Sequence, residues 1–218
     1  MKRFAFTMLE LVFVIVVIGI LAVLAMPRFD ADPLERAAEQ VAGHIRYAQH
    51  LAIVEDKYDP TDAQFITNPG YTATYDHLWF REYWRIRFYI SSSNVYYAVF
   101  SDRDREGNID TATHTEPAID PLTGLYLYVG NSSTDPKNNP KMNLTETYGI
   151  SNVSATCDSG NIDIYFDNMG RPYAGSIAGT DPYSALLQND CVVTLTHQNG
   201  KSAKITVQAE TGYVSVSY

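Results

Sequence analysis

The chain has 218 residues, of which 45% are hydrophobic and 12% aromatic, and its net charge of −9 comes from 16 basic and 25 acidic residues. This length is sufficient for one folded domain with a hydrophobic core in addition to an N-terminal segment. The acidic balance argues against a nucleic-acid-binding protein, which usually carries a basic surface. The sequence contains no nucleophile elbow, phosphate-binding loop, His-Glu-x-x-His or Cys-x-x-Cys motif, so nothing in it indicates an enzyme.

The N-terminus combines a short basic stretch with a long apolar run. Residues 11–26 carry no charge, and one carboxylate, Glu10, lies at the start of the run. With residues 6–9 added, the apolar segment approaches the ~20 residues that a membrane-spanning helix needs. A secretory signal peptide has a shorter apolar stretch and a small-residue cleavage site, which residues 25–28 do not supply. An ordinary membrane anchor leaves Glu10 unexplained, because a carboxylate in the bilayer costs about 2.5–3.5 kcal/mol and by default has a partner.

These residues resemble the N-terminal motif of the type IV pilin superfamily, in which a basic leader precedes Phe-Thr-x-x-Glu and an apolar helix. Here the leader is residues 1–5, and the motif begins at Phe6. The resemblance implies cleavage between Ala5 and Phe6 by a prepilin peptidase, followed by N-methylation of Phe6; the family usually has Gly in place of Ala5. It also implies that Glu10, with Thr7 in the same motif, serves assembly by pairing with the Phe6 amine of a neighbouring pilin. Two charges that are costly alone in lipid are tolerated together, and their pairing sets the register of the subunits.

The N-terminal helix is expected to have two halves. Residues 6–27 should form the membrane-spanning half, which joins the core of the filament, and Gly19 and Pro27 lie where the family often has a helix glycine and a kinking proline. Residues 28–59 should form an amphipathic second half, with Asp32 capping a helix start that has proline in its first turn. An apolar stripe at helical spacing should pack under a sheet. The stripe consists of Leu34, Ala38, Val41, Ile45, Ala48 and Ala52.

Residues 60–218 are expected to form a β-rich periplasmic domain built on an antiparallel sheet, which makes the whole chain a pilin-like α+β protein. Alternating apolar residues predict two strands within 84–100 and a β-meander over 162–218. In a domain exported to the periplasm, Cys157 and Cys191 predict one disulfide, and two free thiols are the alternative.

Three arginines near the first strand pair indicate an alternative function. Arg81, Arg85 and Arg87 lie among aromatic residues, and such a patch can neutralise phosphates and stack on single-stranded DNA. This would suit a minor pilin that takes up DNA. A solvated sheet face explains the same residues, and the acidic surroundings favour it.

The polar stretch after these strands leads to a calcium hypothesis. Carboxylates at every second position followed by Gly107 are similar to the first part of an EF-hand loop, because calcium prefers hard oxygens around a tight turn. The closing position of such a loop is Thr113, and Glu116 or Asp120 would replace it only with a different geometry. A polar hairpin tip is the other interpretation. The candidate calcium ligands are Asp102, Asp104, Glu106 and Asp110.

The C-terminal part carries a second resemblance. Residues 164–172, a later Asn-Gly turn and residues 211–214 are similar to the H-type pseudopilin and T-type minor pilin group, which serves type II secretion pseudopili and type IV pili. It implies a minor subunit held in the bacterial inner membrane by one span, with its C-terminal domain in the periplasm, and then built into a pilus or pseudopilus. DNA-uptake members carry an arginine pair where this chain has Tyr213 and Ser215, so nucleic acid is not an expected partner. A membrane-anchored periplasmic protein that is never processed is the remaining alternative.

Overall fold

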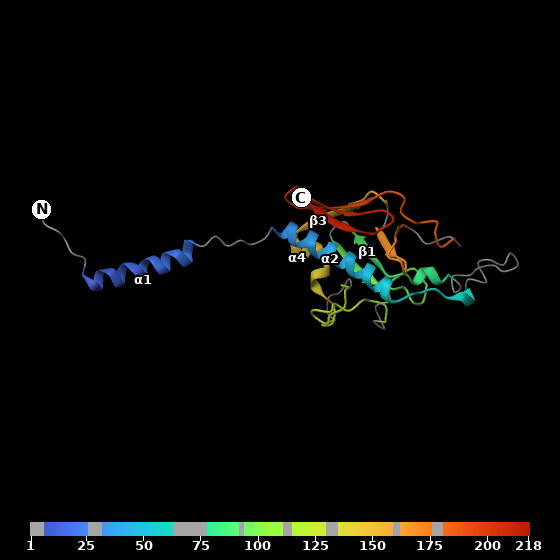
Figure 1. The fold of residues 1–218 in the computed structure, drawn as a ribbon, viewed down its shortest axis with the longest axis horizontal. Helices are drawn as coiled ribbons and strands as arrows, with labels where there is room; N and C mark the ends of the chain where they lie inside the picture. Colours follow the sequence, from blue (N-terminus) through green and yellow to red (C-terminus); the bar gives the residue numbers. More distant parts are fainter. Residues whose placement is uncertain are drawn as a thin grey trace. The chain divides into compact units, whose positions relative to one another are not determined.

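The computed structural model describes residues 7–25, 32–62, 78–91, 94–110, 115–129, 135–158, 162–175 and 181–218. The chain divides into two compact units, Met1–Ala31 and Asp32–Tyr218. Helix α1 (Met8–Ala25) belongs to the first unit, and helix α2 (Pro33–Val54) begins the second (Figure 1). None of the helices in the described part of the chain has the combined length and apolar character required to cross a membrane.

Helix α2 begins where the sequence predicts. The Oδ1 atom of Asp32 accepts a hydrogen bond from the Leu34 N–H at 3.0 Å, and Pro33 lies in the first turn, where its missing N–H is not needed. The helix ends at Val54. All six residues of the predicted apolar stripe are buried, which confirms that this face packs into the core.

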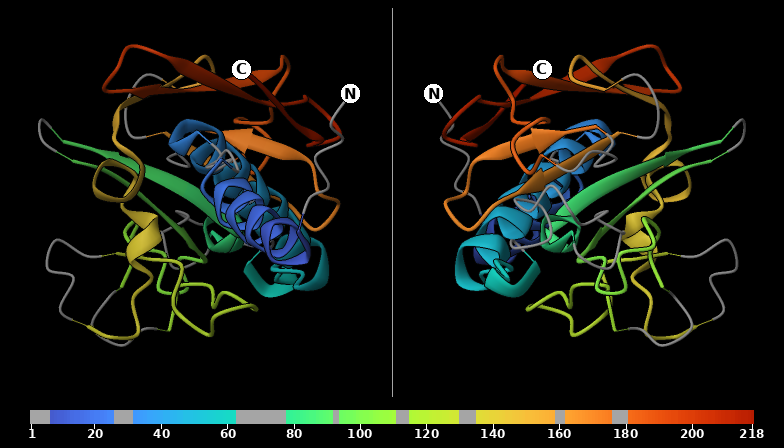
Figure 2. Two further views of the ribbon diagram at one scale, coloured as in Figure 1. Left: turned by 90° about the vertical axis from the view of Figure 1, so that its left-hand side faces the viewer. Right: turned by 90° about the vertical axis from the view of Figure 1, so that its right-hand side faces the viewer.

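In the described part of the chain, helix α2 packs against two four-stranded antiparallel sheets, where the sequence predicted one sheet. Their strand orders are β2–β1–β4–β5 and β3–β6–β7–β8. Helix α2 contacts strands of both sheets, and Figure 2 shows the red strands β6–β8 and the green strands β1 and β2 on different sides of it. The apolar stripe of α2 is therefore a core shared by both sheets. The strands are β1 (Arg85–Ile90), β2 (Val95–Phe100), β3 (Ile150–Ala155), β4 (Asp163–Phe166), β5 (Pro172–Ala174), β6 (Cys191–His197), β7 (Ser202–Val207) and β8 (Val214–Ser217).

The first sheet is buried on both faces. Alternate residues of β4 enter different apolar clusters: Ile164 and Phe166 lie in the main core with α2, whereas Tyr165 lies in a second cluster with Trp79 and Tyr173. Trp79 comes from a short 3-10 helix, η2 (Trp79–Glu82), which brings aromatic side chains to this second cluster. Because both faces are covered, every residue of β4 is buried, and a sheet open to water on one side would not show this pattern.

Polar side chains form hydrogen bonds across the interface between α2 and its neighbours. The Tyr148 hydroxyl, in the short helix α4 (Leu144–Tyr148), donates to Gln40 Oε1 at 2.6 Å. Gln40 Nε2 donates in turn to the Lys141 carbonyl at 2.9 Å, close to the 3-10 helix η3 (Pro140–Met142), and to the Tyr97 hydroxyl at 2.7 Å. These bonds fix α2 against segments about 60 to 110 residues further along the chain.

Candidate functional site

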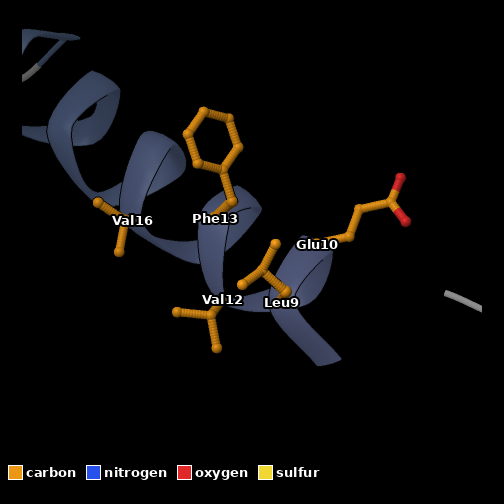
Figure 3. A pocket seen from close by; sticks show the side chains of 5 residues that line it. All are labelled: Leu9, Glu10, Val12, Phe13 and Val16. Carbon is orange, nitrogen blue, oxygen red and sulfur yellow. The ribbon is translucent and has the colours of Figure 1, made fainter. Parts of the chain in front are cut away.

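Helix α1 exposes an apolar surface with one carboxylate at its start. Its side chains from Met8 to Leu21 are exposed, and a shallow hollow on this surface is lined by residues from Leu9 to Val16. Figure 3 shows the Glu10 carboxylate extending away from the other side chains that line the hollow. Monomeric soluble proteins rarely expose so continuous an apolar surface, so this helix is suited to contact another apolar surface.

The two polar residues of the N-terminal motif meet in the first turn of α1. The Glu10 N–H donates to the Thr7 Oγ1 atom at 3.3 Å, so Thr7 caps the helix. Among the described residues, the Glu10 carboxylate accepts no hydrogen bond and forms no ion pair. A carboxylate near a helix N-terminus is favoured by the helix dipole, but the dipole does not neutralise its charge. Within the described residues, the Glu10 charge is therefore not neutralised.

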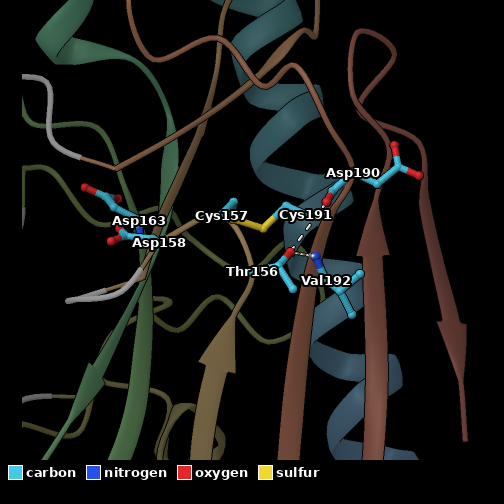
Figure 4. The surroundings of a disulfide bond; sticks show 7 residues. All are labelled: Thr156, Cys157, Asp158, Asp163, Asp190, Cys191 and Val192. Atoms are coloured by element: carbon cyan, nitrogen blue, oxygen red, sulfur yellow. Dashed lines mark hydrogen bonds between the residues drawn. A yellow bond between two sulfur atoms is a disulfide. The ribbon is translucent and has the colours of Figure 1, made fainter.

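The Cys157–Cys191 disulfide is present, as the sequence predicts, and joins the end of β3 to the start of β6 (Figure 4). The two Cα atoms are 5.1 Å apart. Next to the bridge, the Val192 N–H donates to Thr156 Oγ1 at 2.9 Å, and the Thr156 N–H donates to the Val192 carbonyl at 3.1 Å. The bridge therefore extends an existing strand pairing at the edge of the second sheet.

The strand arginines face carboxylates and not solvent. Arg87 Nη2 lies 2.5 Å and Arg85 Nη1 lies 3.5 Å from Asp163 Oδ2, and the side chains of Arg87 and Arg85 are only 12% and 3% exposed. Neither residue forms part of a solvated or DNA-contacting face, and both interpretations are wrong for them. Asp163 occupies the position opposite Arg87 in the β1–β4 pairing. Arg81, the third member of the predicted patch, is partly buried on η2.

The loop after β2 brings together three carboxylates, one of which lies beyond the stretch of alternating carboxylates in the sequence. One oxygen each from Asp102, Asp104 and Glu116 lie within 4.8 Å of one another. Glu116 reaches this group because Pro117 forms an isolated bridge with Phe100, the last residue of β2. This pairing carries Glu116 back alongside the start of the loop.

Backbone N–H groups organise the same loop. Gly107 adopts a φ of 88°, which favours glycine, and its N–H donates to Asp102 Oδ2 at 2.9 Å. The predicted tight turn at Gly107 is therefore present. Glu106 and Asp110, two of the candidate ligands from the sequence, are outside the three-carboxylate group. Glu106 is exposed, and the Asp110 N–H donates to Glu116 Oε2.

The electrostatics of the loop reflect its burial. Burial raises the pKa of Asp102 to about 6; the Arg85 guanidinium opposes this effect, whereas the nearby Asp104 and Glu116 carboxylates add to it. Burial also raises the pKa of Glu116, while backbone N–H donors lower it. The loop therefore concentrates negative charge where water solvates it poorly.

Comparison with known proteins identifies the family. No family model matches the chain, and no solved structure matches it. Over 82 residues the chain is 38% identical to the type IV narrow pilus major component PilA5 of Thermus thermophilus, and the match covers 36% of this chain and 71% of that protein. The chain belongs to the type IV pilin family.

The described part of this pilin includes only some of its motif residues. Thr7, Glu10 and Gly19 lie on or next to α1, which runs through Gly19 without a break. Ala5, Phe6 and Pro27, the positions expected for cleavage, methylation and a helix kink, are outside the described residues. Family membership accounts for the Phe-Thr-x-x-Glu motif at the start of α1, and the fold of the second unit agrees with the expected α+β class.

The carboxylate that pairs with the strand arginines of the pilin was not predicted from the sequence. Asp163 contacts both strand arginines, yet it lies in a short apolar run that predicts only a strand. A signal was available in principle, because an acidic residue inside a strand that contains no other charge needs a cation nearby. The sequence does not say which cation, since that depends on the β1–β4 register.

Proposed function

We propose that this pilin is a structural subunit of a bacterial type IV filament, either a type IV pilus or a type II secretion pseudopilus, and that it assembles through α1. The observation that carries the proposal is the Glu10 carboxylate, which has no partner among the described residues and lies at the start of a helix whose described side chains are exposed. Such a helix needs a covering surface, which other copies of the same kind of helix would supply in a filament core.

The proposed assembly contact follows from charge. Cleavage between Ala5 and Phe6 by a prepilin peptidase creates a new amine four residues before Glu10. This amine is a cation, and it would neutralise the Glu10 carboxylate of a neighbouring subunit. In an apolar filament core an unpaired charge is expensive, so the pair selects one axial offset between subunits.

The proposal also covers the cellular location of the chain and the kind of subunit that it forms. Before assembly, segment 6–27 would hold the chain in the inner membrane, with unit Asp32–Tyr218 in the periplasm. The second resemblance, at residues 164–172 and 211–214, supports a minor subunit or pseudopilin. The similar Thermus protein is named as a pilus component, which favours a type IV pilus over a type II secretion pseudopilus.

The test starts with the mature N-terminus, determined by mass spectrometry of the protein extracted from membranes. A methylated Phe6 start is expected, and an intact Met1 start would contradict processing. The second step compares Glu10→Ala with Glu35→Ala, which removes an exposed carboxylate from α2 instead. We expect sheared filaments to lose the Glu10→Ala subunit and to keep the Glu35→Ala subunit. Normal entry of a processed Glu10→Ala subunit into filaments would rule out the assembly role.

A further inference from the structure

We propose that Asp102, Asp104 and Glu116 form a binding site for a hard divalent cation, calcium. Their carboxylate oxygens lie within 4.8 Å of one another, although the residues come from both ends of a loop. Oxygen ligands select hard cations such as calcium or magnesium over transition metals. This ligand set differs from the set of an EF-hand loop, in which all ligands follow a fixed spacing along one segment.

The hydrogen bonding of Asp102 is the independent observation that points to a ligand. The side chain is fully buried, and its Oδ2 atom accepts the Gly107 N–H at 2.9 Å. Its Oδ1 atom is buried and has no hydrogen-bond partner within the described structure. A buried carboxylate oxygen without a partner is costly, and buried charges are normally paired or coordinate a metal.

The cations of the protein itself satisfy this group incompletely. The closest described guanidinium, on Arg85, lies 3.8 Å from Asp102 Oδ2 and also 3.5 Å from Asp163 Oδ2. Arg85 is therefore divided between two carboxylates on different segments. Arg85 balances only part of the negative charge of the three carboxylates. A divalent ion bound by Asp102, Asp104 and Glu116 would supply the remaining positive charge.

The loop is built to present these oxygens. Glu116 Oε1 accepts the N–H of Arg103 at 2.8 Å and the N–H of Asp104 at 3.4 Å, which fixes the direction of its carboxylate. Asp104 is exposed, so an ion can reach the group from solvent. Calcium suits such a partly open site better than magnesium, because it accepts irregular geometry and completes its shell with carbonyl oxygens and water.

The experiment uses the full-length chain, purified in a mild detergent, stripped with EGTA and titrated with CaCl₂ in a calorimeter. We expect one calcium per chain with a Kd of roughly 10⁻⁴–10⁻³ M, as in extracellular calcium modules. We also expect calcium to raise the thermal unfolding midpoint. Absence of both binding and a midpoint shift up to about 10 mM calcium would overturn the proposal.

Two matched variants identify the ligands. Asp104→Asn and Glu106→Gln each remove one exposed carboxylate from the same loop, but only Asp104 belongs to the group. We expect Asp104→Asn to weaken calcium binding by at least about tenfold and Glu106→Gln to change it by less than about twofold. Equal losses in both variants would indicate general attraction to an acidic loop and would overturn the assigned ligand set. Unfolding in EGTA checks that both variants fold, and tighter binding of MgCl₂ than of CaCl₂ would overturn the choice of calcium.

Discussion

The Tyr97 hydroxyl oxygen lies 2.7 Å from Nδ1 of His44, and the same oxygen accepts a hydrogen bond from Gln40 Nε2. Because Gln40 can only donate through this nitrogen, the single hydroxyl hydrogen of Tyr97 is free to point at His44. When Tyr97 donates this hydrogen to Nδ1, the imidazole is neutral and carries its own hydrogen on Nε2. Burial agrees with this assignment, since it lowers the pKa of His44 to about 4, although the Asp120 carboxylate acts in the opposite direction.

This arrangement predicts a loss of stability in acid. The pKa of His44 falls from 6.5 in the unfolded chain to about 4 in the folded one. Below pH 6.5 the unfolded chain binds a proton at His44 that the folded chain does not bind. The contribution of His44 to the free energy of unfolding is therefore complete above pH 6.5 and is lost as pH falls towards 4. The full loss is about 3 kcal/mol. Urea unfolding of the wild type and of His44→Gln at several pH values measures it, because Gln does not titrate. Parallel pH profiles of the two proteins would contradict the prediction.

Gly212 should tolerate no side chain. It has a φ of 65°, and a Cβ atom there would lie 2.7 Å from the Gly170 carbonyl oxygen and 2.5 Å from Gln49 Nε2. Gln49 Nε2 also donates to the Gly170 carbonyl at 2.8 Å, so the added methyl group would break a contact between α2 and the loop before β5. We expect Gly212→Ala to lower the free energy of unfolding by about 2–4 kcal/mol, from backbone strain and overpacking together.

Gly200 provides the control for this substitution. It also has a positive φ, of 86°, but a Cβ atom there would meet nothing within 4 Å. Gly200→Ala should therefore cost only the backbone strain, about 1–2 kcal/mol. Chemical denaturation of both variants gives the comparison, and equal losses would mean that the close approach at Gly212 is unimportant.

Removal of the disulfide should destabilise the second unit through its unfolded state. The bridge closes a segment with a sequence separation of 34 between Cys157 and Cys191. In the chain-entropy model, opening a loop of this size costs roughly 3–4 kcal/mol. The double variant Cys157→Ala/Cys191→Ala should show this loss in urea unfolding without a reducing agent. Wild type measured with a reducing agent should match the variant, and a reduced wild type as stable as the oxidised protein would contradict the prediction.

Asp163 should be among the least replaceable polar residues. It is the carboxylate that both Arg85 and Arg87 contact, and all three side chains are largely buried. Asp163→Asn removes the negative charge that Arg87 contacts and leaves Arg85 with Asp102 alone, at 3.8 Å. Because a buried cation then lacks its partner, we expect a loss of roughly 3–5 kcal/mol in unfolding free energy. Asp190→Asn is the control, because Asp190 is exposed and accepts one backbone N–H that Asn can also accept. Similar small losses in both variants would show that Arg85 relies on Asp102 instead.

The sequence predicted those features that depend on residue types and their spacing within short segments or on the two cysteines. The Asp32 cap, the apolar face of α2 and the disulfide are all present. The division into two sheets was not predictable in this way, because it depends on which strands pair over long separations. Strand β3 was missed because only Ile150 and Val153 are buried in it, and two isolated apolar residues do not produce an alternating pattern.

The candidate sites show the same limit. Spacing along the chain indicated Asp102 and Asp104 as neighbours, but it offered Glu116 only as an alternative to Asp120. The choice of Glu116 depends on the bridge between Phe100 and Pro117. Spacing also predicted that Arg85 and Arg87 would face solvent on one side of a strand. Arg85 is covered by the chain just before β1, where its Nε atom donates to the Tyr83 carbonyl at 3.4 Å. Arg87 is covered by the loop after β2, where its Nη1 atom donates to the Gly107 carbonyl at 2.7 Å. Cover by a loop that follows the next strand leaves no trace in the alternation of β1 itself.

The disulfide joins the points at which the chain leaves the second sheet and returns to it. Between Cys157 and Cys191 the chain crosses to the first sheet, forms β4 and β5, and comes back to β6. When the protein is stretched by its two ends, the force passes through the disulfide and not through the segment between the two cysteines. A separation of 34 residues corresponds to roughly 110–120 Å of extended chain that a pulling force cannot draw out while the bridge is intact. The segment that contains β4 and β5 therefore carries no pulling force even if every other strand unfolds. Reduction of the disulfide would allow that length of chain to extend.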